Sequence, residues 1–242
     1  MDISLAVTND VIMVWLAAAV AFVILFTGAR LIVSATTTTG RYANFVEAMV
    51  GFVDENIVRE FLGHHAKKWF GFFATLFFFI LFANLIGKIP APGFHSPTGN
   101  INVTAALAVM VFVVAQVVGI VKLGPWGYFK KKFLLPAPLW VQIPAVPIMF
   151  LVLLAEPFSL AVRLFANMTA GHMVLLTFAS AQMVGGVWLL DQPNLLAKAA
   201  AVAPFALSVI LVAFELFVAF IQAFIFTLLS ALYLSESLEE HH

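Results

Sequence analysis

The sequence contains no cysteine, which excludes disulfides, thiolate metal ligands and thiol catalysis together. Charge is scarce as well, because Asp, Glu, Lys and Arg make up only 10% of the 242 residues and the formal net charge is zero. A neutral chain has no general electrostatic attraction to nucleic acid, so no nucleic-acid partner is expected. No Lys or Arg precedes the first apolar segment, which therefore lacks the basic region of a signal peptide and is interpreted as a retained span.

Apolar side chains are abundant. They make up 63% of the residues, against about 45–50% in ordinary globular proteins, and the mean hydropathy is +1.07. A helix that crosses a membrane needs about 20 predominantly apolar residues. Five regions supply them, at about 11–33, 69–87, 102–121, 147–182 and 199–234. The sequence therefore predicts an all-α, polytopic membrane protein in which five membrane-crossing helices form a single integral-membrane domain, residues 1–242.

The segment between the first two crossings, at about 41–68, follows a different pattern. Phe45, Met49 and Phe52 recur at helical spacing, opposite acidic residues such as Glu47 and Asp54. A helix with one apolar and one charged face lies in the membrane interface. We therefore expect one amphipathic surface helix here.

Basic residues are distributed unevenly among the connections between crossings. The first and third connections hold most of them: Arg30, Arg41, Arg59, Lys67 and Lys68, then Lys122, Lys130, Lys131 and Lys132. The second and fourth connections hold one each, Lys88 and Lys198. By the positive-inside rule, the first and third connections face the cytoplasm. With five crossings, the N-terminus is expected outside and the C-terminus in the cytoplasm.

The fourth crossing is unusually long. Residues 147–182 would form about 54 Å of helix at about 1.5 Å per residue, against a hydrocarbon core of about 30 Å. Such a segment either folds back or crosses with a steep tilt. Pro157 is a candidate break point, but no cluster of turn residues follows it. We expect one long, steeply tilted helix with a bend near Pro157.

Arg163 lies within this long segment. A guanidinium at the centre of a membrane helix costs roughly 2.5–3.5 kcal/mol even on the mildest insertion scale, and it cannot lose its proton. At about 100° per residue, four residues share its face: Glu156, Ser159, Asn167 and Ala170. His172 points to the opposite face. The helix thus has a cationic face and a titratable face.

The last crossing carries a second polar stripe. Ser208, Glu215 and Gln222 are spaced by sevens, so they stack on one face of the helix. If this helix packs antiparallel to the fourth crossing, Glu215 and His172 can share a proton. Asn84 and Gln116, in the second and third crossings, are candidates to extend a hydrated path.

Each of these polar residues also has a structural interpretation. Asn84 and Gln116 would then join helices by hydrogen bonds. His172 and Glu215 would form a structural pair. Glu156 would be a counter-ion, either for Arg163 or for a cytoplasmic lysine, and Arg163 itself would belong to a structural ion pair.

Two segments resemble the signatures of a known family, subunit a of the rotary F-type ATP synthase. They are PFSLAVRLFANMTAGH, from Pro157 to His172, and QAFIFTLLSALY, from Gln222 to Tyr233. The segment FANLIG, from Phe82 to Gly87, is similar to a third and weaker signature. Together with the number and orientation of the crossings, the resemblance covers nearly the whole chain.

The resemblance implies a proton-conducting stator subunit without a catalytic nucleotide site, a cofactor or a metal. Its partners would be a c-subunit ring, the b subunits of the peripheral stalk, the remainder of the ATP synthase and the lipid bilayer. Its location would be a bacterial plasma (inner) membrane. In this family the site that selects H⁺ or Na⁺ lies on the c subunit.

Roles for individual residues follow from the same resemblance. Arg163 would face the ring's carboxylates and separate two aqueous half-channels. The other matched positions are His172 and Glu215 in the outer half-channel, Asn84 near its entry, and Asn167 and Gln222 beside the arginine. Glu156 stands where a basic or neutral residue is expected. Together with Ser159 and Gln116 it is a candidate modulator.

Two other functions fit parts of the sequence. An autonomous secondary transporter would bind an anionic solute at Arg163. An intramembrane hydrolase would use Ser159, His172 or Glu215. The hydrolase is weakened by geometry, because His172 points away from Ser159, and no HExxH zinc motif occurs.

Overall fold

The computed structural model describes residues 3–34, 40–89, 95–133, 139–181, 194 and 202–238. Within these ranges the chain forms helices and their connections, and no strand. Five helical regions are long and apolar enough to cross a membrane: Asn9–Arg30, Arg41–Ile86, Ile101–Phe133, Trp140–Phe178 and Leu207–Leu238. The prediction of an all-α, polytopic membrane fold is confirmed. Lys198 and the ends of the expected crossings at 182 and 199–201 lie outside the described residues.

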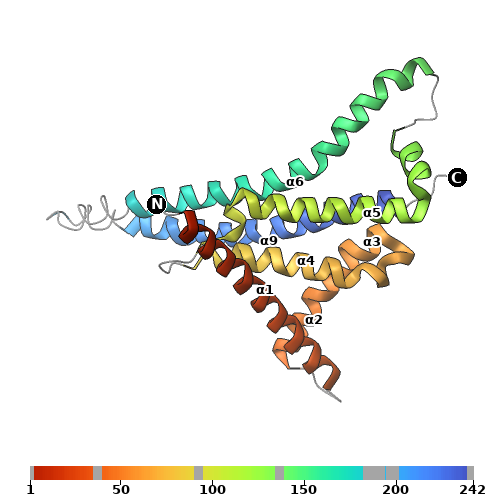
Figure 1. Cartoon of the computed structure of the whole chain (residues 1–242). Coiled ribbons are helices and arrows are strands. Elements are labelled where there is room, and N and C mark those ends of the chain that lie inside the picture. The colour runs from red at the N-terminus through yellow and green to blue at the C-terminus, as the bar shows by residue number, and fades with distance from the viewer. Residues whose placement is uncertain are drawn as a thin grey trace.

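The order of the described elements is simple, and Figure 1 labels most of them. They are α1 (Ile3–Ser34), α2 (Arg41–Val53), the π-helical turn η1 (Asp54–Arg59), α3 (Glu60–Leu62), the 3₁₀ turn η2 (Gly63–His65), α4 (Ala66–Ile86), the 3₁₀ turn η3 (Pro97–Gly99), α5 (Ile101–Phe133), α6 (Leu139–Ala181) and α9 (Val202–Leu238). Helices α4, α5, α9 and the C-terminal part of α6 lie side by side, and α1 crosses them obliquely (Figure 1).

The polar groups of the bundle lie toward its two ends. We call the end at which α1 begins the N-terminal end, and the end at which α9 finishes the C-terminal end (Figure 1). Helices α4 and α6 run toward the N-terminal end, whereas α5 and α9 run away from it. The antiparallel packing of α6 and α9 brings their polar stripes onto neighbouring helices.

Helix α4 is central to the apolar core. Its buried side chains include Phe73, Phe77 and Ile80, which are all fully buried. Phe77 meets Phe220 of α9 edge to face, with ring centroids 5.8 Å apart. A helix that is apolar all round is expected inside a bundle rather than at its surface. Leu164 of α6 is fully buried in the same core, which fixes the rotation of α6.

Helix α5 is interrupted at Gly124, whose φ of 74° and ψ of 159° are not helical. This backbone conformation is open to glycine and strained for residues with a Cβ. Pro125 follows, and the chain continues from it in a different direction. The short return segment brings Tyr128 back against the helix, where its hydroxyl donates a hydrogen bond to Gln116 Oε1. Tyr128 is buried as a result.

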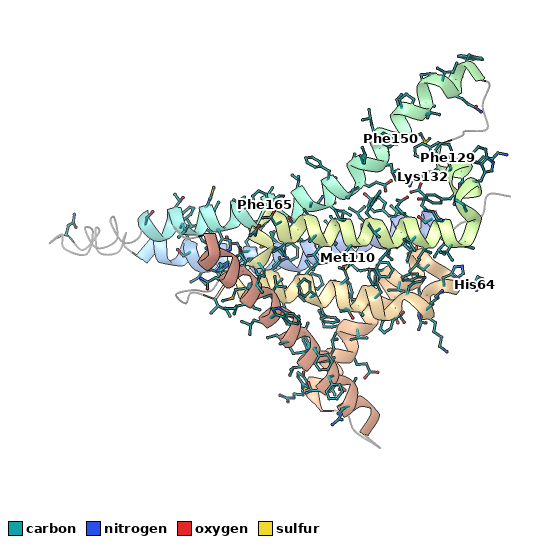
Figure 2. The ribbon with its side chains drawn as sticks, in the orientation of Figure 1. His64, Met110, Phe129, Lys132, Phe150 and Phe165 are labelled. Atoms are coloured by element: carbon teal, nitrogen blue, oxygen red, sulfur yellow. The ribbon has the colours of Figure 1, made fainter. Side chains whose placement is uncertain are left out.

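Helix α6 is continuous over Leu139–Ala181 and contains three prolines: Pro144, Pro147 and Pro157. Proline is tolerated in membrane helices where neighbouring groups satisfy the freed carbonyls. The N-terminal part of the helix diverges from the bundle, and the C-terminal part runs along it (Figure 1). Phe150 contacts Phe133 of the α5 return segment near this divergence, with centroids 6.5 Å apart (Figure 2).

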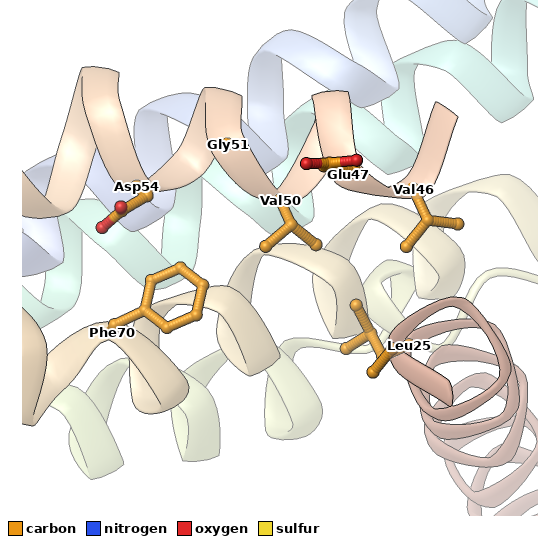
Figure 3. A pocket seen from close by; sticks show the side chains of 8 residues that line it. Leu25, Val46, Glu47, Val50, Gly51, Asp54 and Phe70 are labelled. Atoms are coloured by element: carbon orange, nitrogen blue, oxygen red, sulfur yellow. The ribbon is translucent and has the colours of Figure 1, made fainter. Parts of the chain in front are cut away.

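The expected surface segment consists of α2, η1, α3 and η2. Its apolar side packs on the bundle, since Val53, Ile57 and Val58 are fully buried. Between α1, α2 and α4 lies a cavity of about 240 Å³, lined mainly by apolar residues such as Leu25 and Phe70 (Figure 3). This cavity holds none of the candidate site residues. Whether the segment lies at a membrane surface stays a prediction.

Candidate functional site

Arg163 lies on the outward face of α6. Ser159, Ala166 and Ala170 are exposed on the same face, while Leu160 and Leu164 anchor the opposite face in the core. Arg163 is itself exposed, and it is the one charged side chain on the outward face of Leu139–Ala181. Among the described residues it forms no ion pair. A fixed charge therefore stands on an apolar surface flanked by small side chains, which leave room for a partner to approach.

The stripe predicted around Arg163 divides between two directions. Ser159, Arg163 and Ala170 are exposed, whereas Glu156 and Asn167 are half-buried and turn toward neighbouring helices. Asn167 Nδ2 lies 3.4 Å from Oε1 of Gln222 on α9, a long hydrogen bond. The Nε2 atom of Gln222 is buried and has no hydrogen-bond partner in the described part of the chain. This amide is therefore available to another polar group.

A buried ion pair lies at the N-terminal end. Nζ of Lys88, just after α4, is 2.8 Å from Oε2 of Glu215 on α9, and the two side chains are 5% and 9% exposed. The two groups form an ion pair by distance. Neither carboxylate oxygen of Glu215 makes a hydrogen bond of good geometry within the described residues. A Cβ at Gly171 of α6 would lie 3.2 Å from both Lys88 Nζ and Glu215 Oε1. Glycine thus admits the pair between α9 and α6.

Asn84 belongs to a hydrogen-bond chain beside this pair. Its Oδ1 accepts from Thr98 Oγ1 at 2.6 Å, and its Nδ2 donates to the carbonyl of Ala219 at 3.5 Å. The hydroxyls of Thr98 and Ser96 are 2.6 Å apart, and Ser96 Oγ donates to the carbonyl of Ala83 at 3.1 Å. Asn84 and Thr98 are fully buried. This chain of hydrogen bonds links the segment before α5 to α4 and α9.

The mouth of this cluster carries a second acidic group, Asp10 of α1. Its Oδ1 lies 2.6 Å from Nε2 of His95, and its Oδ2 accepts from Asn100 Nδ2 at 2.5 Å. His95 is 37% exposed at its side chain. The Asp10 carboxylate therefore connects α1 to the segment before α5, at a histidine that water can reach.

His172 of α6 faces the same cluster. Its charge environment is made by Lys88, Glu215 and His95. Its Nε2 atom is buried and lacks a hydrogen-bond partner in the described ranges. His172 and Glu215 are thus neighbours that share Lys88, without a direct hydrogen bond. The hypothesis from the sequence that His172 and Glu215 share a proton did not include Lys88.

A second polar cluster lies toward the C-terminal end. Lys132 of α5 reaches Glu156 of α6 at 3.4 Å and Glu236 of α9 at 3.7 Å. Figure 2 places Lys132 between the α5 return segment and α6. Tyr233 of α9 interacts electrostatically with both Glu156 and Arg163. Of the two counter-ions considered for Glu156, the structure brings the lysine to it.

The lysines of α5 also close the C-terminus of α9. Lys122 Nζ donates to the carbonyl of Leu238, and Lys131 Nζ donates to that of Glu236, both at 2.6 Å. Cations stabilise a helix C-terminus because its last carbonyls have no intrahelical donors. Gln116, held by Tyr128, belongs to this end of the bundle. It therefore lies apart from Asn84, with which it was expected to line one path.

The sequence pointed to some of these groups and missed others. Spacing identified Arg163, Glu215 and Gln222 on their helices, but it says nothing about contacts between residues far apart in the chain. Lys88 was considered only as a basic residue in the connection between two crossings. Asp10 and His95 are in contact although they lie 85 positions apart in the sequence. The one available signal was the unusual number of polar residues between His95 and Asn100 in an otherwise apolar chain. No group of three metal-ligating side chains occurs among the described residues.

Fold and site together define a class: a polytopic helical membrane protein with ionisable groups inside the bundle and a fixed cation on its outer face. Residues 11–235 match the family model described as ATP synthase A chain. The chain is 39% identical over 241 residues to ATP synthase subunit a of Myxococcus xanthus, covering 99% of this chain and 75% of that protein. It is 38% identical over 245 residues to that of Chloroherpeton thalassium, covering 99% and 69%. With Magnetococcus marinus subunit a the identity is 37% over 244 residues, covering 99% and 87%.

The chain belongs to the ATP synthase subunit a family. The predicted resemblance is confirmed. Membership supports a proton-translocating role in the membrane sector of an ATP synthase.

Proposed function

We propose that this chain is the stator subunit that conducts protons to and from a rotating c-subunit ring, with Arg163 separating two half-channels. The observation that carries the proposal is the position of Arg163 relative to the two polar clusters. On α6, His172 lies about 14 Å beyond Arg163 and Glu156 about 10 Å before it, at about 1.5 Å of rise per residue. The clusters thus approach the arginine from opposite ends of the bundle.

The proposed path at the N-terminal end begins at Asp10 and His95. It passes the Asn84–Thr98 chain and reaches Glu215 and His172, which both bury atoms without hydrogen-bond partners among the described residues. Such atoms suit a proton path, because a transient water or a proton can bind them. The polar groups at the other end, Glu156 and Tyr233, would continue the path beyond the arginine.

Arg163 suits the separating role for a physical reason. A ring carboxylate must be ionised when it passes the stator, and a permanent cation favours that ionised form. Arginine stays charged on burial, whereas a buried lysine without a paired carboxylate loses its proton readily. Each charge that crosses 100 mV releases about 2.3 kcal/mol, so a leak past the arginine would waste the driving force. The exposed face of Ser159, Ala166 and Ala170 would lie against the ring.

Orientation and partners belong to the same proposal. The basic ends of α5 and of the α2–η2 segment lie at the C-terminal end, which would face the cytoplasm of a bacterial plasma membrane. The N-terminal cluster would then be the outer half-channel. The c ring would cover the α6 face, and peripheral-stalk b subunits would bind elsewhere on the chain.

Proteoliposomes distinguish this function from that of an autonomous transporter. We expect ATP-driven acidification only when this chain is reconstituted with the c ring and the rest of the ATP synthase. We also expect the chain alone to take up no anionic solute, because Arg163 stands on an open helix face rather than in a cavity. Solute uptake by the chain alone, lost in Arg163→Ala, would establish the transporter instead.

A further inference from the structure

Lys88 has no role in the proton path described so far, although it is the most buried member of the two ion pairs that the described residues form at the N-terminal end. Its side chain is 5% exposed, against 9% for Glu215, 22% for Asp10 and 37% for His95. A buried lysine is costly unless it is paired, and its Nζ lies 2.8 Å from Glu215 Oε2. The two charges therefore hold each other in place.

The surrounding helices leave the pair little freedom to move. Gly171 of α6 lies against it, since a Cβ there would be 3.2 Å from both Lys88 Nζ and Glu215 Oε1. On the other side, Asn84 Nδ2 donates to the carbonyl of Ala219 at 3.5 Å. These two residues each lie four positions from a member of the pair, about one helical turn, so their bond aligns α4 with α9 at the pair. Lys88 thus fixes the Glu215 carboxylate beside the end of α4.

Three further titratable groups lie around this pair. The charges that act on His172 of α6 are those of Lys88, Glu215 and His95. His95, in the segment before α5, contacts Asp10 of α1. Glu215 is the one carboxylate that the described residues place in contact with Lys88. A proton that binds Glu215 must therefore displace the Lys88 ammonium.

Taking the proposed function as its basis, we infer that Lys88 is a positioning residue that sets the pH range over which the outer half-channel takes up protons. A hydronium ion gives a proton to a Glu215 carboxylate oxygen and becomes water, an O–H bond forms, and the Lys88 ammonium moves away with all its hydrogens. The O–H bond breaks when the proton passes to a water molecule further along the path, and the ion pair re-forms. Because the ammonium competes with the proton for one carboxylate, uptake requires a more acidic outer side than it would without Lys88.

The test is ATP synthesis by the complete ATP synthase in proteoliposomes. ADP is supplied outside, so by the proposed orientation the N-terminal end faces the lumen. The lumen pH is varied at constant outside pH, and a potassium diffusion potential keeps the total driving force constant. Lys88→Gln removes the competing cation, so the lumen pH of half-maximal rate should rise by about one unit or more. Lys88→Met, a second neutral variant of similar length, should behave alike.

Three further variants show whether the effect comes from the charge and passes through Glu215. Lys88→Arg keeps the charge and should keep the wild-type midpoint. Lys88→Gln combined with Glu215→Gln should have the midpoint of Glu215→Gln alone. Lys132→Gln removes the lysine of a Lys–Glu pair toward the other end of the bundle and should not move the lumen midpoint.

A role of Lys88 in stability alone would lower the maximum rate of its neutral variants without moving the midpoint. If a variant assembles without turning over, infrared difference spectroscopy of the purified complex replaces the rate. The carboxylic acid band that Glu215→Gln abolishes should then persist to higher pH in the neutral Lys88 variants than in the wild type.

Several results would overturn the inference. One is a midpoint that is unchanged or lower in the neutral Lys88 variants or, by infrared, a Glu215 band lost at the same pH as in the wild type. Others are an equal rise in Lys88→Arg, a rise in Lys132→Gln, and a double variant whose midpoint differs from that of Glu215→Gln. Gradient-driven synthesis by the wild type in these cases would leave the proposed function intact, whereas its absence would contradict the proposed function itself.

Discussion

Replacing Glu215 by glutamine removes one half of a buried ion pair and leaves Lys88 in place. At 2.8 Å and an effective dielectric constant of about 20, the attraction between the two charges is about 6 kcal/mol. The loss of hydration of both groups offsets much of this energy. Removing one partner of a buried pair nevertheless costs about 3–5 kcal/mol, because the other charge remains without compensation.

The double variant, Lys88→Gln with Glu215→Gln, replaces two charges by two neutral amides. Since neither charge is then stranded, we expect it to recover most of the loss seen in either single variant. The coupling energy of this double-mutant cycle should therefore exceed the cost of either single variant, about 3–5 kcal/mol.

The assay is the temperature at which the chain dissociates from the detergent-purified ATP synthase. At about 2–4 °C per kcal/mol for a chain of this size, each single variant should lower that midpoint by about 6–20 °C. Asp54→Asn provides the control. It breaks a pair of nearly equal length, Arg59–Asp54 at 2.7 Å, whose arginine side chain is 69% exposed, and should cost about 1 kcal/mol or less. A double variant no more stable than the worse single variant would refute the reasoning.

Three further variants test other parts of the structure. Thr98→Val leaves the buried side-chain oxygen of Asn84, Oδ1, without its hydrogen-bond donor. It should destabilise the complex by about 1–3 kcal/mol, measured as a lower dissociation temperature. Glu156→Gln should slow ATP-driven proton pumping without abolishing it, while Glu236→Gln, at a side chain 55% exposed, should leave the rate nearly unchanged. Equal effects of these two variants would count against Glu156 as part of the path. Gln222→Leu removes a buried amide whose Nε2 has no partner among the described residues and whose Oε1 accepts only the long bond from Asn167, so heat stability should nearly hold while pumping falls. Full pumping would place that amide outside the path.

The sequence was sufficient for what depends on single helices. Hydropathy predicted five spans, and seven-residue spacing placed Glu215 above Gln222, because these properties are local. The same reasoning predicted one long helix with a bend near Pro157. The helix is continuous from Leu139 to Ala181, and its first part diverges from the bundle while its second part runs along it (Figure 1). Span boundaries near 182 and 199–201 lie outside the described residues.

Contacts between helices were harder to predict from the sequence. The pairing of His172 with Glu215 was inferred from antiparallel packing and from the family resemblance, but the structure pairs Glu215 with Lys88, and Gly171 leaves room for that pair. The sequence alone does not distinguish a lysine that is buried after a span from one that is solvated there. Glu156 had two candidate counter-ions, and only the fold of the α5 return segment brings Lys132 to it.

Substitution of Arg163 by alanine tests whether this arginine is the fixed charge between two half-channels. The measurement is ATP synthesis driven by a proton gradient in proteoliposomes that contain the complete ATP synthase. Thr177→Ala serves as control, because among the described residues that exposed hydroxyl on the same helix bonds the carbonyl of Met173 alone. We predict that Arg163→Ala abolishes synthesis while the complex stays assembled, and that Thr177→Ala preserves it. Normal gradient-driven synthesis in the assembled Arg163→Ala complex would show that Arg163 does not separate the half-channels.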